Sequence, residues 1–436
     1  MIGTCCHLGE EMICSDCVTH ETLKKLIHDT GEDGVCHYCG NEGTALEKEQ
    51  FFQEILDRVA ENTATEDDLS QYEYWMLFEG GSDEIPIDYL DIVLSEWAGL
   101  GDELFFDDLN DYAPKVFKIN DREMDRHYFA DDGALERNFF EDKWNRFIQE
   151  IRHTHRFFNA SAGKFLDSVF DILCGQDGAL KPESVRTITH GEPLYRARSA
   201  STRDQVMKIV KSPASELGPP PKDKASSQRM TPNGISTIYC ALERETCLSE
   251  IRAITGDNVV SIAMTPIVRL NLLDLTRLDR VDAPHLTILD KGYLEAMHLK
   301  TFISSLVKKM SKPKGPGDEL SYLSSQVVFE YLRLRFGREV DGLVFPSVQT
   351  GETGTNVVLF PEASIVSGRN FTGEHEDGEA AEAKAEQPFE SAARLCCIPD
   401  SLRYHKITAI ITQAREYKYS EDLFLSDLAR NRLGMR

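Results

Sequence analysis

The chain has 436 residues, of which 41% are hydrophobic and 28% charged, and its formal net charge is −25. The length and composition are those of a globular protein of two to four domains. A surface this acidic repels phosphates and bilayers, so nucleic-acid binding is an unfavoured function. No apolar run reaches the roughly eighteen residues of a membrane span and no signal-peptide pattern is present. We therefore expect a cytoplasmic protein without membrane contact, whose eleven cysteines stay reduced.

Residues 1–47 contain six of the eleven cysteines. Cys14 and Cys17 form one CxxC pair, Cys36 and Cys39 form another, and eighteen residues separate the two pairs. Four thiolates at this spacing can surround one Zn²⁺ ion tetrahedrally, which leaves no open position for a catalytic water. The segment also has nine acidic residues against two lysines, so we predict a structural zinc ribbon that caps the chain or docks a protein rather than one that binds nucleic acid.

Residues 48–180 are strongly acidic, and their apolar side chains recur at helical spacing in two stripes, within Leu46–Asn62 and within Phe139–Cys174. Such stripes are typical of packing surfaces, and we predict a helical domain here. The stripes consist of Phe51, Phe52, Ile55, Leu56 and Val59 in the first, and of Phe140, Trp144, Phe147, Ile148, Ile151, Phe165, Leu166, Val169 and Phe170 in the second.

Two arginine–histidine pairs lie in this helical zone, Arg122 with His127 and Arg146 with His153. They resemble the motif of HEPN ribonucleases, in which such a pair activates a ribose 2′-hydroxyl for RNA cleavage. Because the zone is rich in Arg and His, the pattern favours a structural helical module of HEPN-like shape over a nuclease.

After Gly175 short β-rich runs alternate with helical segments, which indicates an α+β domain built around a sheet. We assign this domain to residues 181–370, an acidic disordered insertion to 371–393, the last strands to 394–420 and a tail to 421–436. The expected strands are Ser236–Ala241, Val259–Met264, Asp341–Pro346, Asn356–Phe360 and Thr408–Thr412, and the expected helices are Arg244–Ile254 and Ser324–Phe336.

Charge is not uniform along the chain. Between Lys181 and Arg229 there are ten Lys and Arg residues against five Asp and Glu, and a second basic run follows at Lys308, Lys309, Lys312 and Lys314. A basic island in an acidic protein suits a small anionic ligand better than a polyanion. An ordinary solvated surface is the alternative interpretation.

Six segments between residues 187 and 417 carry a family resemblance because they follow one another in a fixed order. They are Pro193–Arg198, Ser227–Gly234, Ile238–Leu242, Glu245–Arg252, Asp341–Ser347 and Thr355–Phe360. In this order they resemble the arginine strand, the Gly-Arg-Phe-Asn-x-x-Gly loop, the tyrosine strand, the glutamate helix, the serine strand and the closing strand of RES domains. Ser227-Gln228 departs from the small glycines that are usual in the loop. Together with the cysteine pairs and the helical zone, the chain resembles the HEPN/RES N-terminal architecture.

The resemblance implies a mixed sheet similar to that of ADP-ribosyltransferases and NAD⁺ as the substrate. Arginine forks hold phosphate oxygens in bidentate fashion, which suits the pyrophosphate of NAD⁺, and an aromatic face can stack on nicotinamide. Cleavage of the nicotinamide–ribose bond builds positive charge on the ribose, which a carboxylate stabilises, and a hydroxyl can bind the ribose or the amide. The candidates are Arg196 and Arg229 for the pyrophosphate, Tyr239 or Tyr195 for stacking, and Arg196, Glu250 and Ser347 as catalytic residues.

Three functions follow from these interpretations. The first is a toxin or antiphage defence effector that destroys NAD⁺ as a glycohydrolase, or as a phosphorylase if phosphate is the acceptor. The second is transfer of ADP-ribose to a protein, and the third is a non-catalytic interaction scaffold. Since free NAD⁺ destruction would kill the host, we expect restraint by an antitoxin, by another regulatory protein or by the amino-terminal domains, and we expect a homo-oligomer.

Overall fold

The computed structural model describes residues 11–423 except 76–86, 117–125, 135–137, 281–285, 312–319, 369–392, 412–413, 415, 418–419 and 421–422. The predicted insertion at 371–393, apart from Ala393, and nearly all of the predicted tail lie outside the described residues. The chain forms two compact units. Unit 1 comprises Met1–Asp142, Asp282–Phe302 and Tyr417–Arg436, and unit 2 comprises Lys143–Val281 and Ile303–Glu416. The domain boundaries at 47 and 180 stay predictions.

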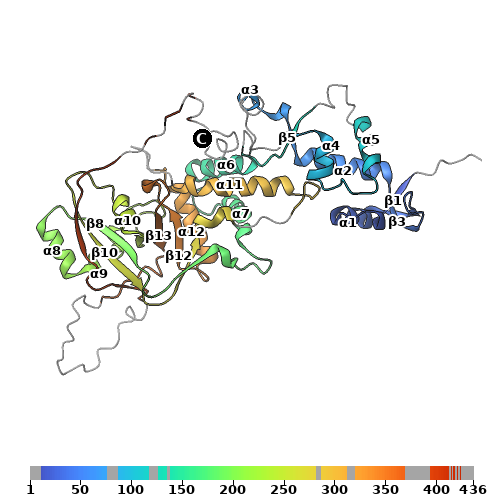
Figure 1. Ribbon diagram of the computed structural model, residues 1–436. Helices are drawn as coiled ribbons and strands as arrows, with labels where there is room; N and C mark the ends of the chain where they lie inside the picture. The colour runs from blue at the N-terminus through green and yellow to red at the C-terminus, as the bar shows by residue number, and fades with distance from the viewer. Residues whose placement is uncertain are drawn as a thin grey trace, which may run out of the picture. The chain divides into compact units, whose positions relative to one another are not determined.

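Unit 1 has two small antiparallel sheets, ordered β1-β3-β2 and β4-β6-β5, together with several helices (Figure 1). The apolar stripe of the predicted first helix is fully packed, since its five side chains are at most 1% exposed. The helix begins at Lys48 rather than Leu46, because Leu46 and Glu47 pair with β1 as the end of β3. The elements are β1 (Met12–Cys14), α1 (Glu21–Thr30), β2 (Glu32–Val35), β3 (Glu42–Glu47), α2 (Lys48–Asn62), β4 (Ala64–Thr65), α3 (Gln71–Tyr74), β5 (Ile87–Asp88), α4 (Leu90–Ile92), α5 (Phe106–Val116) and β6 (Tyr128–Phe129).

Unit 2 is built on a curled, mixed sheet of nine strands (Figure 1). Eight strands follow the order β14-β10-β8-β9-β13-β12-β11-β7, and β15 also pairs with β10. Only the β11–β12 pair is parallel among these ladders. The strands are β7 (Val185–Ile188), β8 (Leu194–Ser199), β9 (Tyr239–Ala241), β10 (Asn258–Pro266), β11 (Leu270–Asp274), β12 (Gly342–Pro346), β13 (Thr355–Leu359), β14 (Leu395–Cys397) and β15 (Arg403–Lys406).

Helices flank this sheet, and α10 contacts both β8 and β9. The helices are α7 (Ala160–Phe170), α8 (Arg203–Lys211), α9 (Pro213–Glu216), α10 (Arg244–Glu250) and α12 (Leu323–Phe336), while the division between the units falls within α6 (Phe139–His153) and α11 (Tyr293–Ser311). Apolar side chains from β8, β10, β11, β12 and β13 form one buried core. None of the described helices combines the length and the apolar composition that a bilayer crossing requires.

Three expected elements of unit 2 differ from the observed ones by more than two residues at an end. The strand expected at Ser236–Ala241 begins only at Tyr239, because the Ile238 N–H donates to the Ser364 hydroxyl instead of to a neighbouring strand. The helix expected to reach Ile254 ends at Glu250, where the backbone turns into the left-handed region at Arg252.

The strand expected at Thr408–Thr412 is wrong. Strand β15 lies earlier, at Arg403–Lys406, where Lys406 pairs with Asn258, the first residue of β10. Ile407 still exchanges backbone hydrogen bonds with Gly256 and Asp257. The described residues Thr408–Ile411 pair with no strand, and Ile410 and Ile411 are exposed. A β-branched run becomes a strand only where a sheet edge is available to it.

Candidate functional site

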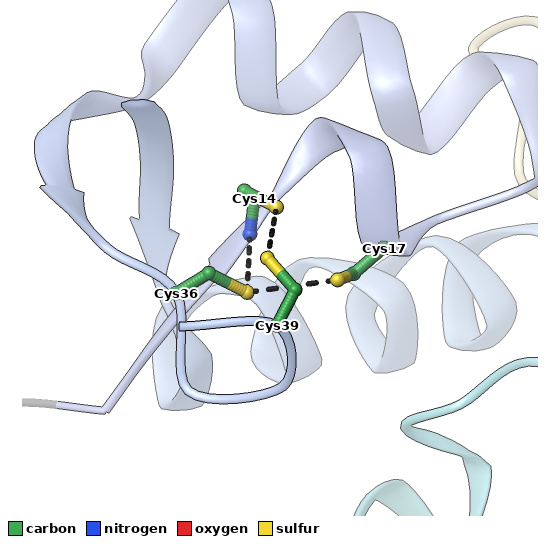
Figure 2. Close-up of side chains that lie close together, drawn as sticks. All are labelled: Cys14, Cys17, Cys36 and Cys39. Atoms are coloured by element: carbon green, nitrogen blue, oxygen red, sulfur yellow. Dashed lines mark hydrogen bonds between the residues drawn. The ribbon is translucent and has the colours of Figure 1, made fainter. Parts of the chain in front are cut away.

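Four cysteines of unit 1 point toward one another (Figure 2). Cys14 is the last residue of β1, and Cys17 ends the short helical turn that follows. Cys36 comes directly after β2, and Cys39 lies in the next turn, where Gly40 takes a φ of +73° that glycine adopts freely. The two predicted CxxC pairs therefore meet because β1 and β2 both pair with β3.

The spacing of the four sulfur atoms fits a tetrahedral metal. The Sγ atoms of Cys14 and Cys39 are 3.6 Å apart, those of Cys36 and Cys17 are 3.7 Å apart, and all four lie within 4.8 Å of one another. Zinc–sulfur bonds of about 2.3 Å place tetrahedral ligands about 3.8 Å apart, whereas a disulfide needs about 2.05 Å. The cluster thus could bind a metal ion and fits a zinc ribbon.

Burial and backbone contacts set the proton affinity of these thiols. Burial raises the pKa of Cys14 and of Cys17. Burial also raises the pKa of Cys36, but the backbone N–H groups of Cys39, Cys14 and Tyr38 outweigh it and lower that pKa to about 6. The Cys14 N–H lies 3.4 Å from the Cys36 sulfur. Cys36 is therefore the thiol most ready to become a thiolate ligand.

A cavity of about 480 Å³ opens in unit 2 over the middle of the sheet. Its walls come from β8, β9, β12 and β13, from the loop before β9, from α10 with the turn after it, and from Tyr322 just before α12. This volume is in the range of small-molecule sites. Of the predicted residues, the cavity brings together Tyr195, Arg196, Arg229, Tyr239 and Glu250.

Two arginines on the cavity wall have no carboxylate partner among the described residues. Arg196 donates from Nη1 to the carbonyl oxygen of Tyr239 at 2.6 Å, and burial lowers its pKa. Arg229 is only 9% exposed, and its Nε has no hydrogen-bond partner in the described part of the chain. A buried guanidinium without a partner is costly, so this corner of the cavity is suited to an anionic ligand.

The loop that carries Arg229 is held by hydrogen bonds from two neighbouring residues of α12. Gln326 of α12 donates to the Ser227 hydroxyl at 2.9 Å and to the Gln228 carbonyl at 2.8 Å. Ser325 of α12 donates to the Arg229 carbonyl at 2.5 Å. The side chains of α12 therefore fix the loop at the point where Ser227-Gln228 replaces small glycines. Sequence reasoning missed both α12 residues because only the fold brings them to the loop.

The hydroxyl group of Tyr239 contacts the same loop. Its hydroxyl accepts from the Met230 N–H at 3.0 Å and lies 3.4 Å from the Thr231 hydroxyl. Burial raises the pKa of Tyr239 to about 12, so the phenol stays neutral at physiological pH. The Tyr239 hydroxyl therefore interacts with the loop, while Tyr239 also lines the cavity.

Of the two carboxylate oxygens of Glu250, one accepts two hydrogen bonds and the other accepts none from the described residues. The Ser347 hydroxyl donates to Oε1 at 2.5 Å, and the Asn356 Nδ2 donates to the same oxygen at 2.7 Å. Oε2 has no hydrogen-bond partner among the described residues. Ser347 is fully buried and does not line the cavity, whereas Asn356 does. The two donors orient the carboxylate and leave Oε2 available to a ligand.

Asn356 was missed by sequence reasoning. It lies in the closing strand, whose other residues after Thr355 are the apolar Val357, Val358 and Leu359. An amide in an otherwise apolar strand must find a partner when buried, and that mismatch is the signal that could have identified it.

Tyr195 and Arg198 are fixed by neighbouring charges. The Arg244 guanidinium lies 4.7 Å from the centre of the Tyr195 ring and donates to the Ser261 hydroxyl at 2.5 Å. Arg198 donates to the Glu216 carboxylate at 2.9 Å. The tyrosine ring therefore has a cation on it that limits its movement, and the charge of Arg198 is already balanced.

The cysteines of the cavity wall are not nucleophiles at physiological pH. Burial raises the pKa of Cys240 to about 11 and that of Cys247 to about 12, so both remain thiols. The chemistry available in the cavity therefore rests on its arginines and on Glu250.

The predicted HEPN-like pairs are only partly described. Arg122 lies outside the described residues, and Arg146 and His153 lie two turns apart on α6, both exposed. No hydrogen bond between Arg146 and His153 is formed. The HEPN resemblance stays a prediction.

Comparison with known families gives one match. The model of the RES domain family matches residues 193–376. The matched range contains the whole cavity and every predicted site residue outside the cysteine cluster. No curated protein matches the chain.

Proposed function

We propose that the protein cleaves the nicotinamide–ribose bond of NAD⁺, because residues 193–376 match the model of the RES domain family, which is associated with NAD-related toxins. The acceptor is water in a glycohydrolase and inorganic phosphate in a phosphorylase. The observation that carries the proposal is the cavity itself. In it, two arginines that have no carboxylate partner among the described residues face the same space as a carboxylate with one available oxygen.

Binding rests on the two arginines. Arg196 and Arg229 hold the pyrophosphate through charge-assisted hydrogen bonds, which are stronger in a water-poor cavity than at the surface. The unpartnered Nε of Arg229 gains an acceptor when the pyrophosphate is bound. Tyr195, with its ring fixed by Arg244, stacks against the nicotinamide. Tyr239 acts mainly by shaping the loop of Arg229.

Cleavage rests on Glu250. As the C1′–N bond breaks, its electron pair goes to the nicotinamide nitrogen and positive charge develops on the ribose ring. Oε2 of Glu250 stabilises that charge or orients the ribose hydroxyls and the incoming nucleophile. Ser347 and Asn356 act as positioning residues, since both donate to Oε1. Ser347 thus acts through Glu250, a different role from the ribose or amide contact expected from the sequence.

The four cysteines of unit 1 hold a structural Zn²⁺ ion. The sulfur spacing and the all-cysteine ligand set suit Zn²⁺ without an open position. The metal stabilises the arrangement of β1, β2 and β3 and supplies no step of the NAD⁺ chemistry.

Incubation of the purified protein with NAD⁺ tests the proposal. Release of free nicotinamide without labelled protein supports hydrolysis or phosphorolysis. Label transferred to protein from NAD⁺ carrying a tagged adenosine supports ADP-ribosyl transfer instead. No nicotinamide release by protein stripped of bound partners would contradict the enzymatic proposal and favour a scaffold.

A further inference from the structure

A second cavity, with a volume of about 290 Å³, is lined by α6 and α7 within unit 2. On α6 its lining residues are Lys143, Arg146, Phe147 and Glu150, which recur at spacings of three and four residues and so share one face of the helix. Every lining residue falls within residues 143–168, before the range that matches the RES family, and none lines the first cavity. This interhelical groove therefore has no part in the proposed NAD⁺ chemistry.

The floor of the interhelical groove is apolar and packed. Phe147 is only 2% exposed, and its ring centre lies 5.6 Å from that of Phe165. The Phe165 ring in turn lies 6.3 Å from the ring of Trp144, so the rings hold one another in place. A flat ligand ring can pack on such a floor, whereas a bare inorganic ion gains nothing from it.

The rim of the groove carries cations from both helices. Arg146 and Lys164 are exposed, and neither forms an ion pair or a side-chain hydrogen bond with the described residues. Lys143 is the third cation that lines the groove, and Glu150 is the only carboxylate among the lining residues. Three cations against one carboxylate give the groove a net charge of +2. A phosphate monoester carries a charge of about −1.5 to −2 at neutral pH, which matches it.

The Glu150 carboxylate has one oxygen available to a ligand. Its Oε2 accepts hydrogen bonds from the Ser161 hydroxyl at 2.5 Å and from the Asn159 Nδ2 at 3.3 Å. Chiefly these two hydrogen bonds lower the pKa of Glu150, so the group is ionised at neutral pH. Oε1 accepts no hydrogen bond from the described residues and can accept one from a ligand hydroxyl.

The groove lies in a basic stretch of an acidic protein. Residues 143–164 contain five Lys and Arg residues against one Glu, whereas the whole chain has a net charge of −25. A polyanion would extend beyond this stretch and be repelled by the acidic remainder, but a ligand with one phosphate group would not. The groove volume is also close to the lower end of the range for small-molecule sites, roughly 300 Å³. Charge and size therefore suit a ligand with one phosphate group and one ring system.

We propose that the interhelical groove binds a nucleoside monophosphate. The base packs against the Phe147 and Phe165 rings. The phosphate lies between Arg146 of α6 and Lys164 of α7, where charge-assisted hydrogen bonds form. Oε1 of Glu150 accepts a hydrogen bond from a ribose hydroxyl. The site goes beyond the proposed function and does not depend on it, because the two cavities share no residue.

Calorimetry on the full wild-type chain tests the proposal. The probes are uridine and cytidine 5′-monophosphate, which carry neither the adenine nor the nicotinamide of NAD⁺, together with uridine and inorganic phosphate. We expect at least one of the two nucleotides to bind. Uridine and inorganic phosphate should each bind at least about tenfold more weakly, because uridine lacks the phosphate and inorganic phosphate lacks the ring.

Substitutions on the rim assign the binding to the groove. Arg146→Gln and Lys164→Gln should each lower the affinity for the nucleotide about tenfold, since each removes one charge-assisted hydrogen bond. Both side chains are exposed and lack a partner in the described chain, so the melting temperature and the rate of nicotinamide release should not change. Arg269→Gln, which removes an exposed arginine outside both cavities, should leave the affinity unchanged.

Arg229→Gln distinguishes the groove from the first cavity, and it should keep the affinity for the nucleotide. A loss of affinity in Arg229→Gln with none in Arg146→Gln would place the nucleotide in the first cavity and overturn the inference. Absence of binding by both nucleotides, or equally tight binding of inorganic phosphate, would also overturn it. Failure of the proposed function is a separate result, seen as absence of nicotinamide release from NAD⁺ by the wild-type protein.

Discussion

The cysteine cluster and the arginine-rich cavity are built in opposite ways. All four cysteines lie between residues 14 and 39, and a three-stranded sheet is enough to bring them together. The cavity draws on residues from Tyr195 to Asn356, carried by four strands (β8, β9, β12 and β13), the loop before β9, α10 with the turn after it, and Tyr322 before α12. The short spacing of its residues along the chain is thus enough to form the first site. The second site depends on a sheet in which neighbouring strands are not consecutive in the sequence. Damage to the two sites should therefore have different consequences.

The largest expected effect is on the cysteine cluster. Structural zinc contributes about 10–16 kcal/mol of apparent binding free energy in zinc-finger peptides, so chelation or Cys36→Ser should unfold the ribbon. Metal analysis should give about one zinc per wild-type chain and none in Cys36→Ser, and amide hydrogen exchange should increase across residues 11–47.

Cys396→Ser, which changes a cysteine far from the cluster in sequence, should keep the metal. A folded, metal-free wild-type ribbon would contradict the zinc assignment. Since no cavity residue belongs to unit 1, nicotinamide release should survive chelation. Loss of nicotinamide release after zinc chelation would show that the two sites are not independent.

The next largest effect is on catalysis by Glu250. Glu250→Gln keeps the shape of the side chain but removes the negative charge that we propose stabilises the ribose cation, and we expect kcat to fall by about a thousandfold. Nicotinamide release measures it. Glu245→Gln changes an exposed glutamate at the start of the same helix and should leave the rate unchanged. Equal rates in the two variants would remove Glu250 from the site.

A smaller loss of kcat is expected when Asn356 is replaced. Asn356→Ala deletes one of the two donors to Glu250 Oε1, and a hydrogen bond to a charged group contributes about 1.5–3 kcal/mol, or roughly ten- to a hundredfold in kcat. The Michaelis constant should change little, because the carboxylate remains but is less well oriented. Steady-state kinetics measures the split between kcat and KM.

Ser347→Ala should behave similarly, and the double variant should lose less than the product of the two single losses because both donors share one oxygen. Asn271→Ala, which removes an amide that accepts from Thr187 outside the cavity, is the matched control. Fully independent losses would show that the two side chains do not act through the same carboxylate.

The smallest effect concerns the pH dependence of stability at the edge of the sheet. His405 of β15 lies 2.8 Å from the Ser261 hydroxyl, which Arg244 also contacts. Burial lowers the pKa of His405, and the positive charges of Arg244 and Arg403 lower it further, against a weaker opposite influence of Glu245.

The unfolded chain therefore takes up the His405 proton at higher pH than the folded chain. Stability should fall as pH drops below the unfolded pKa of about 6.5 and level off below the folded pKa. Melting temperatures between pH 5 and 8 should show a shallower acid-side decline in His405→Gln than in wild type. Parallel profiles would exclude His405 as a contributor.

The patterns that were predictable from the sequence are those that depend on neighbours along the chain. The stripe from Phe51 to Val59 is buried on α2, and the two CxxC pairs meet in one cluster. The strand predicted at Thr408–Thr412 does not form because a strand also needs a free sheet edge. Pairing with β10 stops at Asn258, which lies opposite Lys406. The helix after Arg244 ended early because Arg252 takes a left-handed conformation that no composition rule would assign to an arginine.

For the candidate site, the sequence determined which residue types are available and the order in which they occur. These are the arginines of β8 and of the loop before β9, the glutamate of α10 and the four cysteines. Only the tertiary structure decided how these side chains are arranged around the cavity. It placed Ser347 behind Glu250 rather than on the cavity wall, added Asn356 as a second donor, and set α12 against the Arg229 loop. The physical reason is that hydrogen bonds and burial depend on distances between residues about a hundred positions apart, which the pairing of strands fixes and local spacing does not.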